Sequence, residues 1–430
     1  MQEKLTIGKE FKEALKTMND SNDHLFLTGR AGTGKSTLLT YFRKHTTKKH
    51  VVLAPTGVAA LNVKGQTIHS FFGFHPAITP NLVRKAFPNS LPLFKTIETI
   101  IIDEISMVRA DLLDCIDRAL RLNRDRPKEP FGGVQMIFIG DLYQLPPVVT
   151  SDETYRFQTE YTSPYFFSAY VMEDIHPTII ELKKVHRQKE KAFVQLLDNL
   201  RTNTLDPSDV EEWNTRHDPY FDPREETGYI HLTTTNKMAQ ARNDYELKQL
   251  EGKEWKLMAN SMGELPDRRM PSEPSICVKE GARVMFTMND PERRWVNGTL
   301  GTITRIKTKG LAKIPILEVD LEDGRSVVVE QHKWEMFEYT PGEEGSIEEA
   351  VVGSYIQYPI TLAWAVTIHK GQGKTFDHVL VDIGWGAFAH GQLYVALSRC
   401  TTFRGLVLLK PFRTKDIILD QAVVDFMKKA

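Results

Sequence analysis

The amino-acid sequence predicts an α/β fold in which a doubly wound parallel sheet is followed by a second α/β unit. Three observations support this prediction. Short apolar strands alternate with helical segments in the first half, a similar alternation resumes in the second half, and 430 residues are enough for two to four domains. The chain is therefore too long to be one small binding module.

Four strands are expected in the first half. They are His24–Thr28, Val51–Ala54, Thr99–Ile102 and Met136–Ile139. Each is rich in β-branched or aromatic residues and is followed by small or turn-forming residues, which is typical of buried strands in a parallel sheet. Between Lys64 and Val83 a proline-containing aromatic stretch breaks this alternation. It predicts a small insertion rather than a crossover helix.

A second α/β run is expected to begin near Ile179. Its candidate strands are Thr178–Leu182, Tyr229–Thr233, His378–Asp382 and Leu406–Lys410. Between residues 283 and 357 the pattern changes to short alternating segments separated by turns such as Asn297-Gly298, which predicts a small antiparallel barrel. The segment Pro341–Ala350, rich in glycine and glutamate, is expected to be a surface loop of that barrel.

Composition excludes several classes of protein. Apolar residues at 41% and charged residues at 26% are typical of a folded globular protein and argue against disordered and fibrous chains. Lys plus Arg (55) nearly balances Asp plus Glu (56), so the net charge of −1 provides no overall attraction to nucleic acid or to anionic membranes. Any contact with nucleic acid is expected to be local.

Cysteine usage and the lack of long apolar runs bear on location. Cys115, Cys277 and Cys400 are too few and too scattered for a disulfide framework or a four-ligand zinc site, which favours a reducing compartment. The N-terminus lacks a signal-peptide pattern, and no apolar stretch is long enough to span a membrane. We expect a cytoplasmic protein, associated with the nucleoid if it is bacterial.

A phosphate-binding loop follows the first strand. Gly29–Ser36 fits the pattern G-x-x-x-x-G-K-[ST], whose glycines let backbone N–H groups face inward at a helix N-terminus. Lys35 would reach the β and γ phosphates of ATP, and the Ser36 hydroxyl would hold Mg²⁺. The other expected ATP contacts are Gly32, Thr33, Gly34 and Thr37. A glycine-rich turn with a surface lysine is the less favoured alternative.

Carboxylates and an amide follow the next strands. Asp103 is expected to hold Mg²⁺, and Glu104 to act as the general base on an attacking water. Gln144 follows the fourth strand, at the sheet edge where ligands bind, and would sense the γ-phosphate or the attacking water. The alternatives are solvated carboxylates and a loop glutamine bonded to backbone. The upstream phosphate loop favours the catalytic interpretation.

With these pieces assembled, the sequence resembles the Pif (petite integration frequency) family of superfamily-one helicases. The resemblance rests on the ordered set GRAGTGKST, TIIIDEISM, GDLYQLPPV, KKVHRQ, TIHKGQGKTFD and LYVALSRCT, and it covers almost the whole chain. The stretch from Arg109 to Gly133 also resembles the family's signature segment. Its ordinary interpretation is an amphipathic helix followed by a charged loop.

The resemblance implies an architecture. We expect two RecA-like P-loop motor domains, the first at residues 1–178 and the second at 179–282 together with 358–430. A small wedge insertion would occupy residues 64–83 of the first domain. A barrel of the Src-homology-three type, at residues 283–357, would be inserted in the second.

The resemblance also assigns further nucleotide contacts. Arg187 and Arg399 match the family's arginine fingers, and a guanidinium suits that role because its planar fork can bridge two phosphate oxygens. Gln372 and Gly373 would lie nearest the nucleotide. A second phosphate loop at GQGKT is disfavoured because no glycine lies five residues before Gly373 and because Leu362–His369 is predicted to be helical.

The sequence does not identify a residue that recognises adenine. Relatives usually carry a glutamine near the N-terminus, where this chain has Lys9-Glu10, and Gln2 is not an obvious match. Discrimination between ATP and other triphosphates is therefore not predicted.

The resemblance also assigns contacts with single-stranded DNA. They are Thr56, Thr67, His69, Pro147, Thr234, Asn236, His369 and Lys370. Such small polar donors at strand ends hold phosphates without reading the base sequence. Helix capping is an equally favoured explanation for each threonine. Phe71, Phe72 and Phe74 could form a strand-separating wedge, although a local core is the more common use of such a cluster.

The function we expect from these features is an ATP-dependent, Mg²⁺-dependent DNA helicase that moves 5′ to 3′ on single-stranded DNA. Its partners would be single-stranded DNA and junctions of single- and double-stranded DNA, with G-quadruplex DNA a further candidate. We expect a monomer in solution. The alternatives are an RNA-directed or dual-specificity translocase, and a nucleotide-gated DNA-binding switch that does not unwind.

Overall fold

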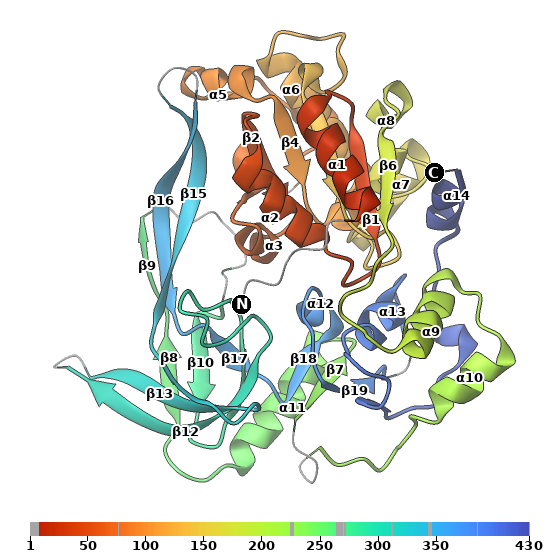
Figure 1. Cartoon of the computed structure of the whole chain (residues 1–430). Helices are drawn as coiled ribbons and strands as arrows, with labels where there is room; N and C mark the ends of the chain where they lie inside the picture. The colour runs from red at the N-terminus through yellow and green to blue at the C-terminus, as the bar shows by residue number, and fades with distance from the viewer. Residues whose placement is uncertain are drawn as a thin grey trace.

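The computed structural model describes residues 8–75, 77–223, 228–263, 270, 272–310, 313–342, 346–384 and 386–429. Two α/β halves lie one above the other, with antiparallel strands along one side of both (Figure 1). The first half is built on a six-stranded parallel sheet in the order β3-β2-β4-β5-β1-β6. Its strands are β1 (Leu25–Gly29), β2 (His50–Ala54), β3 (Gln66–Thr67), β4 (Thr99–Ile102), β5 (Gln135–Ile139) and β6 (Thr178–Leu182).

Helices cover both faces of this sheet. They are α1 (Lys9–Asp20), α2 (Lys35–His45), α3 (Gly57–Asn62), α4 (Ile68–Phe72), α5 (Leu91–Thr96), α6 (Ala110–Asn123), α7 (Ser151–Glu160) and α8 (Val171–Asp174). Successive residues of β4 point into different cores, with Ile100 and Ile102 in one buried cluster and Ile101 in another. Burial on both faces explains why the strands are continuously apolar.

Four first-half strands are confirmed, but the predicted membership of Thr178–Leu182 is wrong. We expected this strand to belong to the second run, whereas it pairs in parallel with β1 along its whole length and forms an edge of the first sheet. An apolar run identifies a strand without indicating the sheet it joins, so only the long-range pairing could settle this point.

The second half contains a four-stranded parallel sheet in the order β18-β7-β19-β20. Its strands are β7 (Tyr229–Thr233), β18 (Ala365–Thr367), β19 (His378–Asp382) and β20 (Leu406–Leu408). The helices after β6 are α9 (Lys191–Thr202), α10 (Pro207–Asn214), α11 (Asn236–Gln249), α12 (Ile368–Gly371), α13 (Gln392–Leu397) and α14 (Gln421–Lys429).

The predicted helix over Leu362–His369 is wrong for most of its length. Ala365–Thr367 forms β18, which pairs in parallel with β7, and only Ile368 and His369 are helical. Periodicity cannot separate a short buried strand from a buried helical turn, and the β-branched Val366 and Thr367 favour the strand. The glycine spacing still argues against a second phosphate loop here.

Antiparallel strands follow β7 and α11, as the turn spacing predicts. Three sheets have the orders β14-β13-β12-β11-β17, β15-β16-β9 and β10-β8. Their strands are β8 (Trp255–Met258), β9 (Asn260–Gly263), β10 (Ser275–Val278), β11 (Arg283–Phe286), β12 (Leu300–Lys309), β13 (Ile314–Leu321), β14 (Ser326–Val329), β15 (His332–Pro341), β16 (Ile347–Gln357) and β17 (Ile360–Leu362). That they form a barrel stays a prediction.

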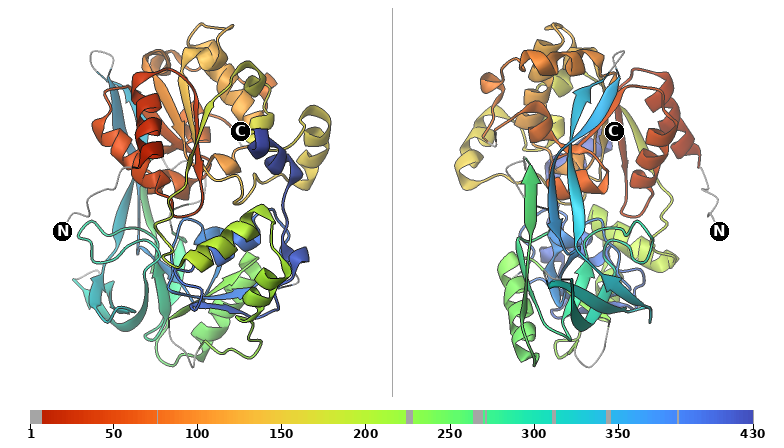
Figure 2. Two further views of the ribbon diagram at one scale, coloured as in Figure 1. Left: turned by 45° about the vertical axis from the view of Figure 1, so that its right-hand side comes forward. Right: turned by 90° about the vertical axis from the view of Figure 1, so that its left-hand side faces the viewer.

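In the segment Pro341–Ala350, the described residues other than Gly342 and Ser346 are strand rather than the expected surface loop. β15 and β16 pair as far as Pro341 and Ile347, and residues 343–345 of the segment lie outside the described residues. The hairpin runs alongside the first half near α5 (Figure 2). There the Val52 N–H donates a hydrogen bond of 3.3 Å to the Tyr339 hydroxyl. The two halves are therefore linked by a strand pair as well as by the connecting chain.

The aromatic cluster near α4 packs as a local core. Phe71 is buried, with its ring centroid 5.5 Å from that of Phe94, and the rings of Phe72 and Phe74 stack with centroids 5.1 Å apart. This arrangement matches the local-core alternative. A wedge role for residues 64–83 stays a prediction.

The C-terminal helix α14 returns to the first half of the molecule (Figure 1, Figure 2). The Phe426 ring stacks on Phe167 with centroids 4.4 Å apart and planes 7° apart. Val423 is fully buried in the same cluster as Phe26 and Ile100. The first half is thus completed by residues from the end of the sequence.

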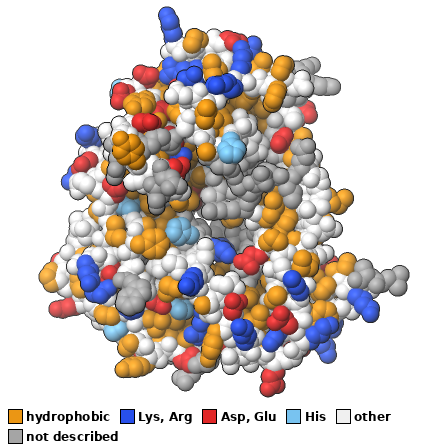
Figure 3. All heavy atoms as spheres, turned by 180° about the vertical axis from the view of Figure 1, so that it is seen from behind, with side chains coloured by type: hydrophobic (Ala, Val, Ile, Leu, Met, Phe, Trp, Pro, Cys, Tyr) orange, Lys and Arg blue, Asp and Glu red, His pale blue; other side chains and the backbone are white. Residues whose placement is uncertain are grey.

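Surface charge agrees with the balanced composition. Positive and negative side chains are interspersed over the back of the molecule (Figure 3). None of the helices in the described part of the chain has the length and apolar character needed to cross a membrane.

Candidate active site

The phosphate loop lies between β1 and α2. Gly32 and Gly34 have φ of +78° and +94°, which favour glycine. A Cβ added to Gly32 would stand 2.5 Å from the Arg187 Cβ, and the His186 N–H donates a hydrogen bond of 2.9 Å to the Gly32 carbonyl. The glycines therefore permit both the turn and the close approach of the chain that leaves the first sheet.

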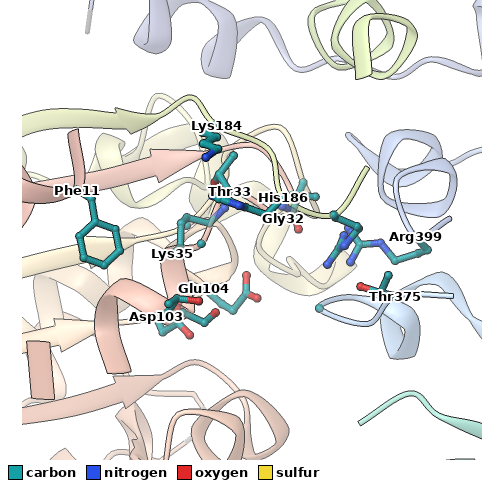
Figure 4. Close-up of a pocket in the computed structure, with 18 residues that line it drawn as sticks. Phe11, Gly32, Thr33, Lys35, Asp103, Glu104, Lys184, His186, Thr375 and Arg399 are labelled. Carbon is teal, nitrogen blue, oxygen red and sulfur yellow. The ribbon is translucent and has the colours of Figure 1, made fainter. Parts of the chain in front are cut away.

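A cavity of about 740 Å³ opens beside this loop (Figure 4). It brings together most of the predicted nucleotide and catalytic residues. Those that line it are Gly32, Thr33, Gly34, Lys35, Ser36, Thr37, Asp103, Glu104, Gln144, Arg187, Gly373 and Arg399. Gln372 is joined to this site through Glu104, because its Nε2 donates a hydrogen bond of 3.2 Å to the Glu104 carboxylate. Residues far apart in the sequence thus converge on one site.

Lys35 is held by the loop itself. Its ammonium donates hydrogen bonds to the carbonyls of Gly29 (2.5 Å) and Arg30 (3.1 Å). Burial lowers the pKa of Lys35, while the nearby carboxylates of Asp141 and Glu104 oppose this shift. A desolvated ammonium beside backbone N–H groups is well suited to bind phosphate oxygens.

Asp103 and Glu104 follow β4 directly. Burial, together with the neighbouring Glu104, raises the pKa of Asp103 to about 7, and burial also raises the pKa of Glu104. Two adjacent half-buried carboxylates repel each other, and a divalent cation would relieve that repulsion. The Ser36 hydroxyl lines the same cavity, so the donor set fits Mg²⁺ completed by phosphate and water oxygens.

Gln144 is oriented by a buried ion pair that the sequence did not reveal. Its Nε2 donates a hydrogen bond of 3.1 Å to Asp141, and Asp141 in turn accepts one of 3.0 Å from Arg201. Burial would raise the pKa of Asp141, but Arg201 and Lys35 outweigh it and lower that pKa. Arg201 also lies over the Tyr143 ring, 4.3 Å from its centroid. The loop after β5 is therefore tied to α9.

Two arginines, Arg187 and Arg399, line the cavity, and Arg187 packs directly against Gly32 of the phosphate loop. Arg187 Nη1 donates a hydrogen bond of 3.2 Å to the Ser398 carbonyl, and Arg399 Nε donates one of 2.8 Å to the Val395 carbonyl. Burial and the neighbouring Arg187 lower the pKa of Arg399 to about 9. In the described part of the chain, the hydrogen bonds of the two guanidinium groups go to backbone carbonyls and to the Ser398 hydroxyl rather than to carboxylates. Both are therefore available to an anion.

The cavity also contains residues that sequence reasoning missed: Phe11, Lys184, His186 and Thr375. Phe11 lies on α1 at the opposite end of the cavity from Arg399 (Figure 4). No motif signals an isolated aromatic residue on an amphipathic helix. Lys184 and His186 flank Val185 within KKVHRQ and could have been found from that motif.

The predicted DNA contacts of the first half lie at adjacent strand ends. Thr56 follows β2, Thr67 ends β3, and the two strands are paired. Each threonine caps a helix: the Thr56 hydroxyl accepts from the Ala59 N–H and the Thr67 hydroxyl from the Ser70 N–H, both at 3.2 Å. Thr56 and Thr67 therefore cap helices, and their contact with DNA stays a prediction; each cap leaves a helix N-terminus at the sheet edge. His69 is half-buried on α4.

The predicted DNA contacts of the second half also follow adjacent strands, but they differ from one another in solvent exposure. Thr234 and Asn236 follow β7, and His369 and Lys370 follow the adjacent strand β18. Asn236, His369 and Lys370 are exposed, whereas Thr234 is buried. Pro147 is buried as well, so neither it nor Thr234 presents its side chain to solvent in this structure. The Lys370 ammonium lies 3.2 Å from Glu273.

The chain is similar to several known proteins. The family model described as PIF1-like helicase matches residues 6–206. The ATP-dependent DNA helicase Pif1 of Bdellovibrio bacteriovorus is 32% identical, with 95% of this chain and 89% of the relative covered. The ATP-dependent DNA helicase PIF1 of Homo sapiens is 32% identical over 90% of this chain, which spans 58% of that relative. The chain likewise spans 62% of the length of the relative from Emericella nidulans.

Solved structures agree with these sequence matches. The structure of Bacteroides sp Pif1 in complex with ADP-AlF4 is 35% identical with a TM-score of 0.91, and covers 99% of this chain and 97% of its own. Bacteroides Pif1 bound to ssDNA, at the same identity and coverage, gives a TM-score of 0.71. The Bdellovibrio relative is 32% identical and 89% of its length is covered, and the predicted motifs converge on one cavity. The chain therefore belongs to the PIF1-like helicase family.

Proposed function

We propose that this chain is an ATP-dependent DNA helicase whose ATP site is the cavity between its two halves. The observation that carries the proposal is the composition of that cavity. Lys35, Glu104 and Gln144 line it from the first half, and Arg399 lines it from the second. A site that needs both halves can couple hydrolysis to their relative movement, which a simple binding domain cannot do.

The chain's own residues can perform the hydrolysis. Lys35 and the loop N–H groups bind the β and γ phosphates, and Arg187 and Arg399 stabilise the charge that develops on the transferred phosphoryl group. Glu104 takes the proton of the attacking water, a role helped by its raised pKa. Gln144 orients that water, because Asp141 fixes its amide.

Ser36 and Asp103 are the residues that would hold Mg²⁺. When bound, the ion would neutralise negative charge on the phosphate oxygens during phosphoryl transfer. The nucleotide base would lie at the Phe11 end of the cavity, stacked on that ring, because Arg399 lies at the opposite end and Lys35 of the phosphate loop lies between them (Figure 4). Phe11 follows Lys9-Glu10 directly, and these two residues do not by themselves select adenine.

The substrate we propose is single-stranded DNA, bound across both halves and at junctions with duplex. Small polar groups at the strand ends of each half support this, as does the solved structure of Bacteroides Pif1 bound to ssDNA. The residues proposed to contact it are Thr56, Thr67, His69, Pro147, Thr234, Asn236, His369 and Lys370. Pro147 and Thr234 are buried in this structure, so their part in the proposal includes a shift of the two halves when DNA binds.

The finer points remain part of the same proposal. They are movement from 5′ to 3′, a wedge at residues 64–83, a barrel at residues 283–357, action on G-quadruplex DNA and a monomeric state in solution. A related structure describes two coordinating Pif1 helicases at forked dsDNA, so two copies on one substrate is the alternative to a lone monomer. The boundaries of the two motor domains belong here too, with β6 assigned to the first.

The decisive experiment measures strand release from duplexes that carry either a 5′ or a 3′ single-stranded tail. Wild type with ATP and Mg²⁺ should unwind the 5′-tailed duplex. Glu104→Gln should bind ATP and tailed DNA but lose turnover and unwinding, because the general base is removed. If wild type hydrolyses ATP and binds the tailed duplex yet releases no strand, the helicase proposal fails and the nucleotide-gated switch is favoured.

Substrate class is tested with the same protein. The ATPase rate is compared with DNA and RNA single strands of equal length and sequence. Stimulation by DNA alone supports the proposal, whereas equal stimulation by RNA supports the dual-specificity alternative.

A further inference from the structure

Tyr394 connects the two halves at the phosphate loop. It lies on α13, in the second half, and its side chain is only 5% exposed. Its hydroxyl accepts a hydrogen bond of 3.2 Å from the Ala31 N–H, within the loop Gly29–Ser36 of the first half. The contact therefore joins the backbone of the candidate ATP site to a helix more than 360 positions later in the sequence.

The protonation state of this phenol does not change under ordinary conditions. Burial and the nearby Asp141 raise the pKa of Tyr394 to about 12, so the group stays neutral. Ala31 is 7% exposed, and a buried backbone N–H that loses its acceptor is costly. The contact therefore favours one position of α13 relative to the loop.

The same helix fixes the position of Arg399. α13 ends at Leu397, and Arg399 Nε donates a hydrogen bond of 2.8 Å to the carbonyl of Val395, the residue after Tyr394. The guanidinium also donates from Nη2 to the Ser398 hydroxyl at 2.8 Å. A short chain of contacts thus runs from Ala31 through Tyr394 and Val395 to Arg399.

The turn that carries Arg399 is held from a second side by Gln188. Its Nε2 donates hydrogen bonds to the carbonyls of Ser398 (3.0 Å) and Cys400 (2.9 Å). Arg187, which packs against Gly32, also donates a hydrogen bond to the Ser398 carbonyl, so the Tyr394 hydroxyl is one of two contacts between this part of the second half and the phosphate loop. Removing that oxygen should change the position of the turn without unfolding it.

We propose that Tyr394 is a positioning residue for ATP hydrolysis. Its hydroxyl aligns α13 on the phosphate loop and so sets where the Arg399 guanidinium meets the γ-phosphate. This inference rests on the proposed ATPase function. It predicts that the loss of the hydroxyl impairs the transition state more than the binding of ATP, because a displaced guanidinium affects mainly the charge that develops during transfer.

The first test compares Tyr394→Phe with Tyr355→Phe in the DNA-stimulated ATPase assay. Tyr355 is a matched control, because it is also buried and its hydroxyl donates a hydrogen bond of 3.0 Å to a backbone carbonyl, that of Ser272, on the antiparallel strands. Tyr394→Phe should lower kcat about tenfold while the KM for ATP changes less than about twofold. Tyr355→Phe should lower thermal stability to a similar extent and leave kcat unchanged.

The second test measures the affinity for fluorescent ADP with and without aluminium fluoride, which mimics the transferring phosphoryl group. Tyr394→Phe should bind ADP like wild type. The gain in ADP affinity that aluminium fluoride causes should be about tenfold smaller in the variant than in wild type. In an Arg399→Ala background, Tyr394→Phe should cause no further loss, because the residue through which it acts is absent.

The outcomes separate this inference from the proposed function. Unchanged kcat in Tyr394→Phe overturns the inference, and so does a full additional loss in the Arg399→Ala background. A wild type without DNA-stimulated ATPase activity overturns the proposed function instead. Equal loss of kcat in Tyr394→Phe and Tyr355→Phe reduces the role of Tyr394 to stability and also overturns the inference.

Discussion

The ion pair between Arg201 and Asp141 makes a quantitative prediction about how the two halves are held together. The two side chains are 5% and 0% exposed and lie 3.0 Å apart. Replacing Arg201 with Met keeps most of the side-chain volume but leaves the Asp141 carboxylate buried without its main partner. Breaking a buried pair in this way costs about 3–5 kcal/mol, because the remaining charge stays desolvated.

The change is measured as the free energy of unfolding in urea. All six tryptophans lie after residue 212, so their fluorescence follows the second half, whereas far-ultraviolet circular dichroism follows the whole chain. Arg201→Met should shift both signals, because the pair joins the two halves. The ATPase rate should fall as well, since Asp141 orients Gln144.

Two further variants show whether the desolvated charge is the cause. Asp141→Asn combined with Arg201→Met should recover stability to within about 1 kcal/mol of wild type, because no buried charge remains unpaired. Lys309→Met breaks an exposed pair with Glu330, whose side chains are 69% and 54% exposed, and should cost less than about 1 kcal/mol. If Arg201→Met costs no more than Lys309→Met, the reasoning is refuted.

Two other predictions concern stability. Burial lowers the pKa of His231 to about 4, so the unfolded chain binds a proton that the folded chain excludes, and stability is lost as pH falls below about 6.5. Between pH 7.5 and pH 5 this loss amounts to about 2 kcal/mol of the free energy of unfolding. Urea unfolding should detect the loss in wild type and show a smaller one in His231→Leu. An unchanged pH dependence in the variant would contradict the prediction. Phe426→Ala should cost about 2 kcal/mol because Phe426 is partly buried against Phe167, whereas Phe87→Ala, at a position 85% exposed, should cost less than about 0.5 kcal/mol. Equal melting temperatures for these two variants would show that α14 is not held by this contact.

The candidate site was largely predictable because its parts are local. The phosphate loop, Asp103 and Glu104 each follow a strand with a clear apolar pattern, and the carboxyl ends of parallel strands meet at one edge. What could not be predicted depends on pairing between distant segments. Phe11, Arg201 and Tyr394 carry no motif, and they reach the cavity or its immediate surroundings only because the fold brings α1, α9 and α13 to it.

The same limit explains the errors in the fold. A five-residue apolar run defined β6 correctly but could not say that its partner is β1 rather than β7. A shorter run at Ala365–Thr367 did not distinguish strand from helix, and the choice was wrong. The segment Pro341–Ala350 has the composition of a loop, yet cross-strand pairing keeps Pro341 and residues 347–350 extended.

The return of α14 to the first half has a consequence for how the protein is made. Val423 belongs to the same buried cluster as Phe26, and Phe426 covers Phe167, so a ribosome must synthesise the whole second half before this cluster can close. Until then the nascent first half exposes an aromatic surface while the rest of the chain is translated. Such a surface is a binding site for a chaperone or a starting point for aggregation. The yield of folded protein should therefore depend on how quickly translation reaches the final helix.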